Sequence, residues 1–445
     1  MARQLFGTDG IRGVAGEYPL QPRLVKAFGT ALAHWASQHG KQPEVVIGMD
    51  TRESGQWLAE AVAGGLAAGG VKTRFAGLIT TPGVAYLTRT QDFVAGVMIS
   101  ASHNPFQDNG LKVFDHSGFK LPDEQENMLE GEIFKLLESA PEPPSLPLEV
   151  DPGLDARYVD FLASTFQGSL KNLNIVLDCA NGASEHLAPE LFERLGAQVH
   201  AIGCDANGRN INLNCGALHV ENLREQVLAR GADLGVAFDG DADRAMFISG
   251  NGKLVDGDHV LLVVGRHLLS QGKLPGDQVV ATVMSNLGLE RALEASGIKL
   301  TRTPVGDKYV LEEMVRSGAV IGGEQSGHVI FRDSATTGDG MLTAVRLLDV
   351  VTSTGHTLDE LSADLKIYPQ ILVNVRFKNK RPLADCPQVN QQIREVEESF
   401  GNAGRVLVRF SGTEPLARVM VEGPEIERVK AGAERIAEAL RVELA

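Results

Sequence analysis

Apolar runs that end in glycine- or aspartate-containing loops recur along the chain, and each is followed by a helix-like stretch. Three such segments span residues 45–55, 175–183 and 279–288. Continuous apolar runs that alternate with helices are typical of parallel α/β sheets, whose strands are buried on both faces. The segments recur at intervals of roughly 100–130 residues, which indicates three related α/β units.

The pattern changes near the C-terminus. Residues 370–377 alternate like a strand, residues 387–400 follow a helical pattern, and the apolar runs 405–410 and 417–423 flank a loop. Pro424 is expected to open a final helix. The apolar residues of this helix recur at spacings of three and four: Ile426, Val429, Ala433, Ile436 and Leu440. These elements predict a small α+β domain.

Three segments mark candidate domain boundaries. Residues 138–152 contain five prolines, a density that excludes a continuing helix or a central strand. Further boundaries are expected near residues 249–258 and 366–370. The chain is therefore expected to form four domains: residues 1–150, 151–252, 253–367 and 368–445.

Composition narrows the class of protein. Of 445 residues, 42 are Lys or Arg and 57 are Asp or Glu, a formal net charge of −15 that argues against general binding of nucleic acid or anionic membranes. The N-terminus has no apolar signal-peptide core, and no apolar run approaches a membrane span in length. The four cysteines lack CxxC spacing, which favours free thiols in a reducing cytoplasm: Cys179, Cys204, Cys215 and Cys386.

A serine-rich turn follows one of the apolar runs. Residues 100–105 read SASHNP and come directly after the run 93–99. Asn-Pro after a strand is commonly an ordinary turn. The carboxyl end of a strand is also where open α/β sheets bind ligands, so an activated serine hydroxyl is the alternative.

An acidic loop, DGDADR at residues 239–244, follows the run LGVAF. Its carboxylates at Asp239, Asp241 and Asp243 would repel one another unless a cation neutralised them, and oxygen ligands favour Mg²⁺. An EF-hand calcium loop is excluded, because its sixth and twelfth positions hold Arg244 and Gly250. A solvated acidic turn is the alternative.

Two later loops combine glycines with polar or basic side chains. Residues 322–328 (GGEQSGH) combine glycines with polar side chains that match sugar hydroxyls, although a plain polar loop has a similar composition. In residues 409–418 (RFSGTEPLAR), two arginines bracket a Ser-Gly-Thr turn. Such a turn is either a phosphate-binding loop or a basic β-turn.

Taken together, these loops resemble the motifs of one family. The matching stretches are FGTDGIRG (6–13), SASHNP (100–105), DGDADR (239–244), TVMSNLGLE (282–290), VGDKYV (305–310), GGEQSGH (322–328) and SGTEPLARVMVEG (411–423). On these stretches, which span nearly the whole chain, the sequence resembles the α-D-phosphohexomutases. The resemblance implies three topologically similar mixed α/β domains and a smaller C-terminal α+β domain around a central cleft. Gln325 and the first stretch are similar to the glucosamine branch of the family.

The resemblance also implies roles for individual residues. Ser102 would carry a phosphoryl group and, with Asp239, Asp241 and Asp243, bind the metal. The four domains would then be a phosphoserine, a metal-binding, a sugar-binding and a phosphate-binding domain in chain order. The implied substrate-binding residues are Arg244, Gly306, Asp307, Lys308, Glu324, Ser326, Arg409, Ser411, Gly412, Thr413 and Arg418.

Several basic residues are candidates for proton transfer during catalysis. His328, Lys112 and Arg12 match basic positions of the family near the transferring group. An arginine hardly deprotonates, so Arg12 is expected to stabilise charge. His103 is also a candidate because it adjoins Ser102, although neighbouring side chains at a strand end usually point apart.

The implied reaction is the reversible conversion of glucosamine 6-phosphate to glucosamine 1-phosphate, which feeds UDP-N-acetylglucosamine synthesis. It would pass through phosphoserine and a 1,6-bisphosphate, with one Mg²⁺ per subunit and glucose or glucosamine 1,6-bisphosphate as activator. The expected partners are sugar phosphates, a second subunit in a homodimer, and either a kinase or autophosphorylation to prime Ser102.

Other functions remain as alternatives: a glucose or mannose phosphomutase, a metal-dependent phosphatase with a serine nucleophile, or a sugar-phosphate sensor. One stretch also departs from the family. Residues 215–221 read CGALHVE where the family usually has CGSTHPE, so Ala217, Leu218 and Val220 replace its Ser, Thr and Pro. These replacements are expected to change the local contacts of residues 215–221.

Overall fold

The computed structural model describes residues 4–7, 9–40, 42–379, 381–410 and 415–444. The chain divides into two compact units, of which the first comprises residues 1–283 and 301–362, and the second residues 284–300 and 363–445. Within the described ranges, no helix is both long and apolar enough to cross a membrane.

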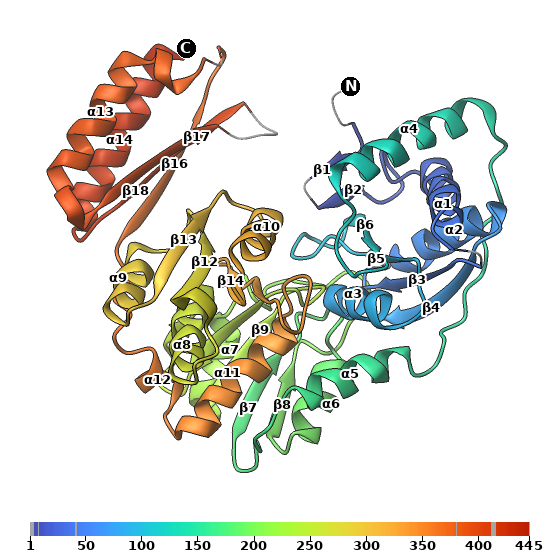
Figure 1. The fold of residues 1–445 in the computed structure, drawn as a ribbon, viewed down its shortest axis with the longest axis horizontal. Coiled ribbons are helices and arrows are strands. Elements are labelled where there is room, and N and C mark those ends of the chain that lie inside the picture. The colour runs from blue at the N-terminus through green and yellow to red at the C-terminus, as the bar shows by residue number, and fades with distance from the viewer. Residues whose placement is uncertain (1–3, 8, 41, 380, 411–414, 445) are drawn as a thin grey trace. The chain divides into compact units, whose positions relative to one another are not determined.

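The first unit begins with a mixed sheet in the order β1-β2-β6-β5-β3-β4 (Figure 1). Its strands are β1 (Phe6–Gly7), β2 (Gly10–Val14), β3 (Glu44–Met49), β4 (Lys72–Leu78), β5 (Ala95–Ile99) and β6 (Asp108–Asp115). The accompanying helices are α1 (Pro22–Ser37), α2 (Gly55–Ala68), α3 (Thr81–Thr90) and α4 (Asp123–Ser139). Strand β3 is parallel to β4 and β5, as its continuous apolar run predicts. The proline-rich residues 141–149 form neither helix nor strand.

The second sheet has the order β11-β10-β9-β7-β8. Its strands are β7 (Asn174–Asp178), β8 (Gln198–Ile202), β9 (Leu234–Phe238), β10 (Ala245–Ser249) and β11 (Leu254–Val255). The helices of this region are α5 (Leu154–Ser164), α6 (Leu187–Arg194) and α7 (Glu221–Arg230). Strand β7 is parallel to β8 and β9, and β10 is an antiparallel neighbour of both β9 and β11.

The third sheet has the order β13-β12-β14-β15. Its strands are β12 (Gln278–Thr282), β13 (Lys299–Thr303), β14 (Ile321–Gly323) and β15 (Val329–Phe331). The helices in this part of the chain are α8 (Gly257–Ser270), η1 (Pro275–Asp277), α9 (Leu287–Ala295), α10 (Asp307–Ser317), α11 (Gly340–Thr354) and α12 (Leu358–Leu361). Of these, α9 belongs to the second unit. Helix α8 begins with a capping box, in which Asp256 and His259 each bond the other's backbone N–H.

The three sheets share one arrangement of four strands. In each, the first strand lies between the second and the third, and the fourth is an antiparallel neighbour of the third. The third strand is parallel to the first in each case. The prediction of three topologically similar α/β units is therefore confirmed. The connections from third to fourth strand span residues 100–107, 239–244 and 324–328, which are three of the loops singled out in the sequence.

The second unit contains an antiparallel sheet in the order β16-β18-β17. Its elements are β16 (Gln370–Arg376), η2 (Leu383–Asp385), α13 (Pro387–Phe400), η3 (Gly401–Ala403), β17 (Arg405–Phe410), β18 (Leu416–Glu422) and α14 (Ile426–Glu443). Figure 1 shows α13 and α14 side by side along this sheet. The apolar residues predicted for the last helix are buried, except that Ile426 is 46% exposed. The helix begins at Ile426 with Glu425 as its N-cap, so Pro424 precedes it instead of opening it.

Candidate active site

Ser102 lies just beyond β5, at the start of the connection to β6. It is 2% exposed, and its backbone has a φ of 53°, in the left-handed region that residues other than glycine rarely adopt. Such a conformation costs on the order of 1–3 kcal/mol and persists only where the surroundings enforce it. Strain of this kind concentrates at functional sites, which favours the chemical interpretation of this turn over the ordinary one.

The hydroxyl of Ser102 contacts two candidate residues. Its Oγ donates to Oδ2 of Asp239 at 2.6 Å, although 137 residues separate the two in the sequence. It also lies 3.4 Å from Nδ1 of His103, so these adjacent side chains approach each other instead of pointing apart. Burial, with smaller contributions from Arg244 and Arg12, lowers the pKa of His103 to about 4. The His103 ring is therefore neutral at neutral pH.

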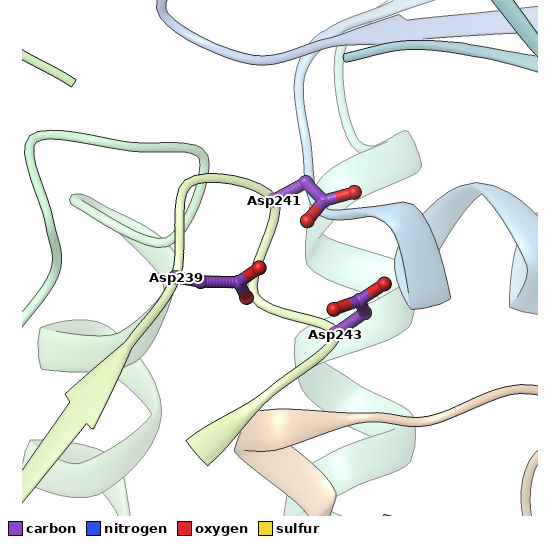
Figure 2. Close-up of side chains that lie close together, drawn as sticks. All are labelled: Asp239, Asp241 and Asp243. Atoms are coloured by element: carbon purple, nitrogen blue, oxygen red, sulfur yellow. The ribbon is translucent and has the colours of Figure 1, made fainter. Parts of the chain in front are cut away.

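The three aspartates form one buried cluster in the loop after β9 (Figure 2). A carboxylate oxygen from each lies within 4.8 Å of the others. Burial, together with repulsion from Asp243 and Asp241, raises the pKa of Asp239 well above its usual value. Burial acts in the same direction on Asp243, but the charges of His328 and Lys112 outweigh it and hold the pKa of Asp243 low.

The aspartate cluster fits a divalent cation. Oδ1 of Asp241 and Oδ1 of Asp243 are buried, and neither accepts a hydrogen bond from the described residues. Buried carboxylate oxygens that accept no hydrogen bond are costly, and a hard cation with oxygen ligands satisfies them. The geometry therefore favours a metal site over a solvated acidic turn.

Lys112 on β6 supplies a positive charge beside this cluster. Its side chain is 1% exposed, and Nζ lies 2.8 Å from Oδ2 of Asp241, 3.2 Å from Oδ2 of Asp9 and 3.8 Å from Oδ2 of Asp243. Burial alone would lower the pKa of Lys112, but these carboxylates outweigh it and raise that pKa. Lys112 is therefore held as an ammonium ion, which suits charge stabilisation and opposes a role as general base.

Two arginines predicted for the site also lie near carboxylates. Arg12 on β2 forms an ion pair with Asp9. Nε of Arg244 lies 3.7 Å from Oδ1 of Asp243, and the backbone N–H of Arg244 donates to Oδ1 of Asp239 at 3.1 Å. Both guanidinium groups thus add positive charge near the end of β5 and the loop after β9.

His328 is buried between two acidic groups. Its Nδ1 lies 3.6 Å from Oδ1 of Asp243, and its Nε2 lies 3.8 Å from Oδ2 of Asp307. The backbone N–H of Gly338 donates to Nε2 at 3.0 Å, so a neutral ring carries its proton on Nδ1, toward Asp243. Burial alone would lower the pKa of His328, but the charge of Asp243 outweighs this effect and raises that pKa. Both ring nitrogens are thus engaged with protein groups.

One hydrogen bond between predicted sugar-binding residues joins the third loop to the start of α10. Oε1 of Glu324 accepts a hydrogen bond from the backbone N–H of Gly306 at 3.1 Å. Ser326 at the tip of the loop is exposed. Nζ of Lys308 donates to Oδ1 of Asp123 at 2.5 Å, and Asp307 forms an ion pair with Lys120 at 2.6 Å.

Three residues of this site were not predicted from the sequence. Asp9 contacts Lys112, Arg12 and Lys120, and its place within FGTDGIRG was the available signal. Thr81 at the start of α3 donates its hydroxyl to Asp241 and its backbone N–H to the Asp241 carbonyl at 3.0 Å. No sequence pattern pointed to Thr81 or Lys120.

In the second unit, Arg409 and Arg418 lie opposite each other on β17 and β18. Burial and the charge of Arg418 lower the pKa of Arg409. Like charges directly across a ladder are destabilising, and an anion bound between them would offset the repulsion. The predicted residues Ser411, Gly412 and Thr413 lie outside the described residues.

Comparison with known proteins identifies the family. Models of the four phosphoglucomutase/phosphomannomutase domains match residues 3–140 (alpha/beta/alpha domain I), 156–252 (domain II), 256–368 (domain III) and 372–439 (C-terminal domain). The phosphoglucosamine mutase of Solibacter usitatus (strain Ellin6076) is 62% identical over 444 residues, which cover 100% of both chains. This chain belongs to the phosphoglucosamine mutase family. The family resemblance predicted from the motifs is confirmed, and with it membership of the isomerases that act as phosphohexomutases.

Other phosphoglucosamine mutases and solved structures extend the comparison. The phosphoglucosamine mutase of Koribacter versatilis (strain Ellin345) is 50% identical over 449 residues, or 99% of this chain and 97% of the relative. A phosphoglucomutase/phosphomannomutase family protein of Burkholderia thailandensis shares the fold with a TM-score of 0.80 at 24% identity, over 98% of this chain and 97% of that one. The Aspergillus fumigatus N-acetylphosphoglucosamine mutase, solved with GlcNAc-6P and magnesium, has a TM-score of 0.69 at 20% identity, over 99% and 95% of the two chains.

The segment that departs from the usual phosphoglucosamine mutase pattern is held mainly by its backbone. The N–H of Gly216 donates to Oδ2 of Asp178 at 2.9 Å, and the N–H of Ala217 donates to the carbonyl of Phe238 at 2.8 Å. Val220 is 8% exposed and packs in the core beside α7, whereas Leu218 is 53% exposed. Neither backbone bond needs the hydroxyls that the usual Ser and Thr would supply.

Proposed function

We propose that the protein interconverts glucosamine 6-phosphate and glucosamine 1-phosphate through a phosphoserine at Ser102. The observation that carries this proposal is the contact of Ser102 Oγ with Asp239, at 2.6 Å, inside a buried cluster of three aspartates. Phospho-Ser102 transfers its phosphoryl group to the free hydroxyl of the bound sugar phosphate. The resulting 1,6-bisphosphate turns around and returns its other phosphoryl group to Ser102.

The residues around Ser102 suit this transfer, which depends on positioning and on neutralising negative charge. Asp239, Asp241 and Asp243 would hold one Mg²⁺ per subunit, which when bound supplies positive charge to the phosphoryl oxygens. Lys112 is held as an ammonium ion by its carboxylate partners and adds a fixed positive charge. Arg244, 20% exposed beside the same loop, adds another.

The proposal assigns the proton of the Ser102 hydroxyl to His103. Of the basic candidates, Lys112 stays protonated, Arg12 is paired with Asp9, and both ring nitrogens of His328 are engaged. His103 is neutral and contacts Oγ of Ser102. A phosphoryl group on Ser102 would place negative charge beside this ring and raise its pKa, so that a protonated His103 would donate the proton to the Ser102 oxygen as the phosphoryl group leaves. The attacking sugar hydroxyl loses one proton in the same step, so the number of protons is unchanged.

The sugar and its second phosphate need separate groups. Glu324 and Ser326 are proposed to bind sugar hydroxyls in both orientations of the bisphosphate, with Gly306, Asp307 and Lys308 beside them. In the second unit, the opposed guanidinium groups of Arg409 and Arg418 are proposed to hold the phosphate that is not being transferred. Glucose or glucosamine 1,6-bisphosphate would activate the enzyme by phosphorylating Ser102. A cytoplasmic location and a homodimer stay predictions from the sequence.

The proposal is tested by ³¹P NMR of glucosamine 6-phosphate with the protein, Mg²⁺ and a trace of glucose 1,6-bisphosphate. Parallel samples contain glucose and mannose 6-phosphates. We expect a 1-phosphate signal that grows at constant total sugar phosphate, fastest with glucosamine. Faster growth with glucose or mannose would assign the enzyme to the other branch, and release of inorganic phosphate would indicate a phosphatase.

A further inference from the structure

Arg52 is a buried cation in the loop between β3 and α2, and the proposed function gives it no role. Its side chain is 0% exposed. Nη2 donates to the carbonyls of Ser102 at 2.8 Å and Asn104 at 2.9 Å, and Nη1 donates to the carbonyl of Pro105 at 2.5 Å. Three backbone carbonyls of the SASHNP turn therefore converge on one guanidinium group.

The same guanidinium group is fixed from its other side. Its Nε donates to Oδ2 of Asp50 at 2.9 Å, and Asp50 is also 0% exposed. Oδ2 of Asp50 also accepts from the hydroxyl of Ser100 at 2.6 Å, and Oγ of Ser100 in turn accepts the backbone N–H of Ser102 at 2.9 Å. A closed chain of hydrogen bonds thus joins Arg52 to both the N–H and the carbonyl of Ser102.

The chain of bonds rests on two neighbouring parallel strands. Asp50 directly follows β3 and Ser100 directly follows β5, where the ladder pairs Met49 with Ile99. The sheet therefore sets the spacing of these two side chains independently of the turn. A turn that holds a serine at a φ of 53° needs such support, because the conformation is unfavourable by itself.

We propose that Arg52 is a positioning residue that locks the Ser102 turn in the conformation needed for phosphoryl transfer. This inference rests on the proposed function of Ser102. Arg52 acts through geometry more than through charge, since its N–H groups point to Asp50 and to backbone carbonyls. A lysine at this position would keep the charge, but its ammonium group has no planar fork to reach the carboxylate and three carbonyls together.

The test compares Arg52→Lys with the unmodified enzyme by steady-state kinetics. Loss of alignment at the reacting atoms without loss of substrate contacts should lower kcat by up to about 100-fold and leave KM within about twofold. The matched control is Arg23→Lys, because exposed Arg23 on α1 makes one comparable bond, to the carbonyl of Leu137 at 2.6 Å. The control should retain unmodified kcat and KM. An unchanged kcat in Arg52→Lys, or an altered KM alone, would overturn the proposal.

A second readout separates this inference from the proposed reaction. The ³¹P resonance of phosphorylated Ser102 should shift or broaden in Arg52→Lys and stay unchanged in Arg23→Lys, which requires no turnover. An identical resonance in all three proteins would refute the positioning role even if the mutase reaction is established. Conversely, a shifted resonance in a protein that turns over no sugar phosphate would leave the positioning of the turn intact and remove the proposed function.

A second variant covers the case in which Arg52→Lys does not fold. Nδ2 of Asn212 donates to the carbonyls of Ser102 at 2.9 Å and Asn104 at 3.2 Å. Asn212 itself has a φ of 59°, so Asn212→Gly removes these donors in a conformation that glycine adopts freely. We expect a smaller fall in kcat with unchanged KM. No change in kcat would contradict the idea that hydrogen bonds to these carbonyls support catalysis.

Discussion

Lys112 offers a direct test of how the buried charges at the aspartate cluster are balanced. Its ammonium group contacts Asp241 at 2.8 Å and Asp9 at 3.2 Å with almost no access to water. Removing one partner of a buried ion pair leaves the other charge uncompensated and costs about 3–5 kcal/mol. At about 2–4 °C per kcal/mol for a domain of this size, Lys112→Met should lower the unfolding temperature in EDTA by roughly 10 °C.

The response to Mg²⁺ distinguishes charge neutralisation from loss of packing. Without the ammonium group beside Asp241, the aspartate cluster should attract a cation more strongly. Each tenfold gain in metal affinity adds about 1.4 kcal/mol, or roughly 4 °C, to the Mg²⁺-induced rise in unfolding temperature. Mg²⁺ should therefore restore part of the stability that Lys112→Met loses, whereas turnover stays low because the fixed charge is missing.

The matched control is Lys120→Met. Lys120 also pairs with Asp9, but its second partner is Asp307, which lies outside the aspartate cluster, and its side chain is 24% exposed. This variant should lose about 1.5–3 kcal/mol and gain no more from Mg²⁺ than the unmodified protein. Thermal unfolding of the three proteins in EDTA and in Mg²⁺ measures both effects. Equal Mg²⁺ responses in the two variants would refute the idea that Lys112 neutralises the cluster.

Three further predictions concern single residues. Ser102→Ala should abolish mutase turnover in a ³¹P NMR assay while circular dichroism stays native, and near-normal turnover would remove the phosphoserine assignment. Arg418→Ala should raise KM for every phosphorylated sugar, because one phosphate loses a charged partner, and an unchanged KM would exclude this role. Burial raises the pKa of Asp339, the N-cap of α11, to about 6. Folded Asp339 therefore binds its proton more tightly than unfolded Asp339, and the native state loses about 3 kcal/mol as pH rises from about 4 through 6. Asp339→Asn should lessen this loss in denaturant titrations, and parallel pH profiles for the two proteins would contradict the raised pKa.

The sequence predicted the parts of the site that follow a clear strand. SASHNP and DGDADR each come directly after a continuous apolar run, so their place at the end of a buried strand could be inferred. The same reasoning could not identify the basic groups that neutralise the three aspartates. Lys112 and Asp241 are 129 residues apart, and no spacing rule connects residues on different sheets. For the same reason, the sequence did not identify Lys120 and Thr81 as residues of the site.

The hydrophobic pattern along the chain also could not predict the direction of every strand in the three sheets. Apolar runs predicted parallel neighbours for β3, β7 and β12, and these are present. The antiparallel fourth strand of each sheet depends on a short hairpin connection whose direction hydrophobicity does not specify. In the final helix, the apolar spacing predicted that Ile426 faces the core. Ile426 is the first residue of the helix, and its side chain is exposed.

The common strand arrangement of the three sheets gives each sheet one loop of the candidate site. Each of the three loops joins a strand with a parallel neighbour to the antiparallel strand beside it, so both ends of the loop are anchored by ladder hydrogen bonds. Under the proposed function, phosphoryl acceptance, charge neutralisation and sugar contacts would each belong to a separate hairpin of this repeated arrangement. A change of sugar specificity by substitutions in residues 324–328 is therefore expected to leave the support of the hairpins that carry Ser102 and the aspartates unchanged.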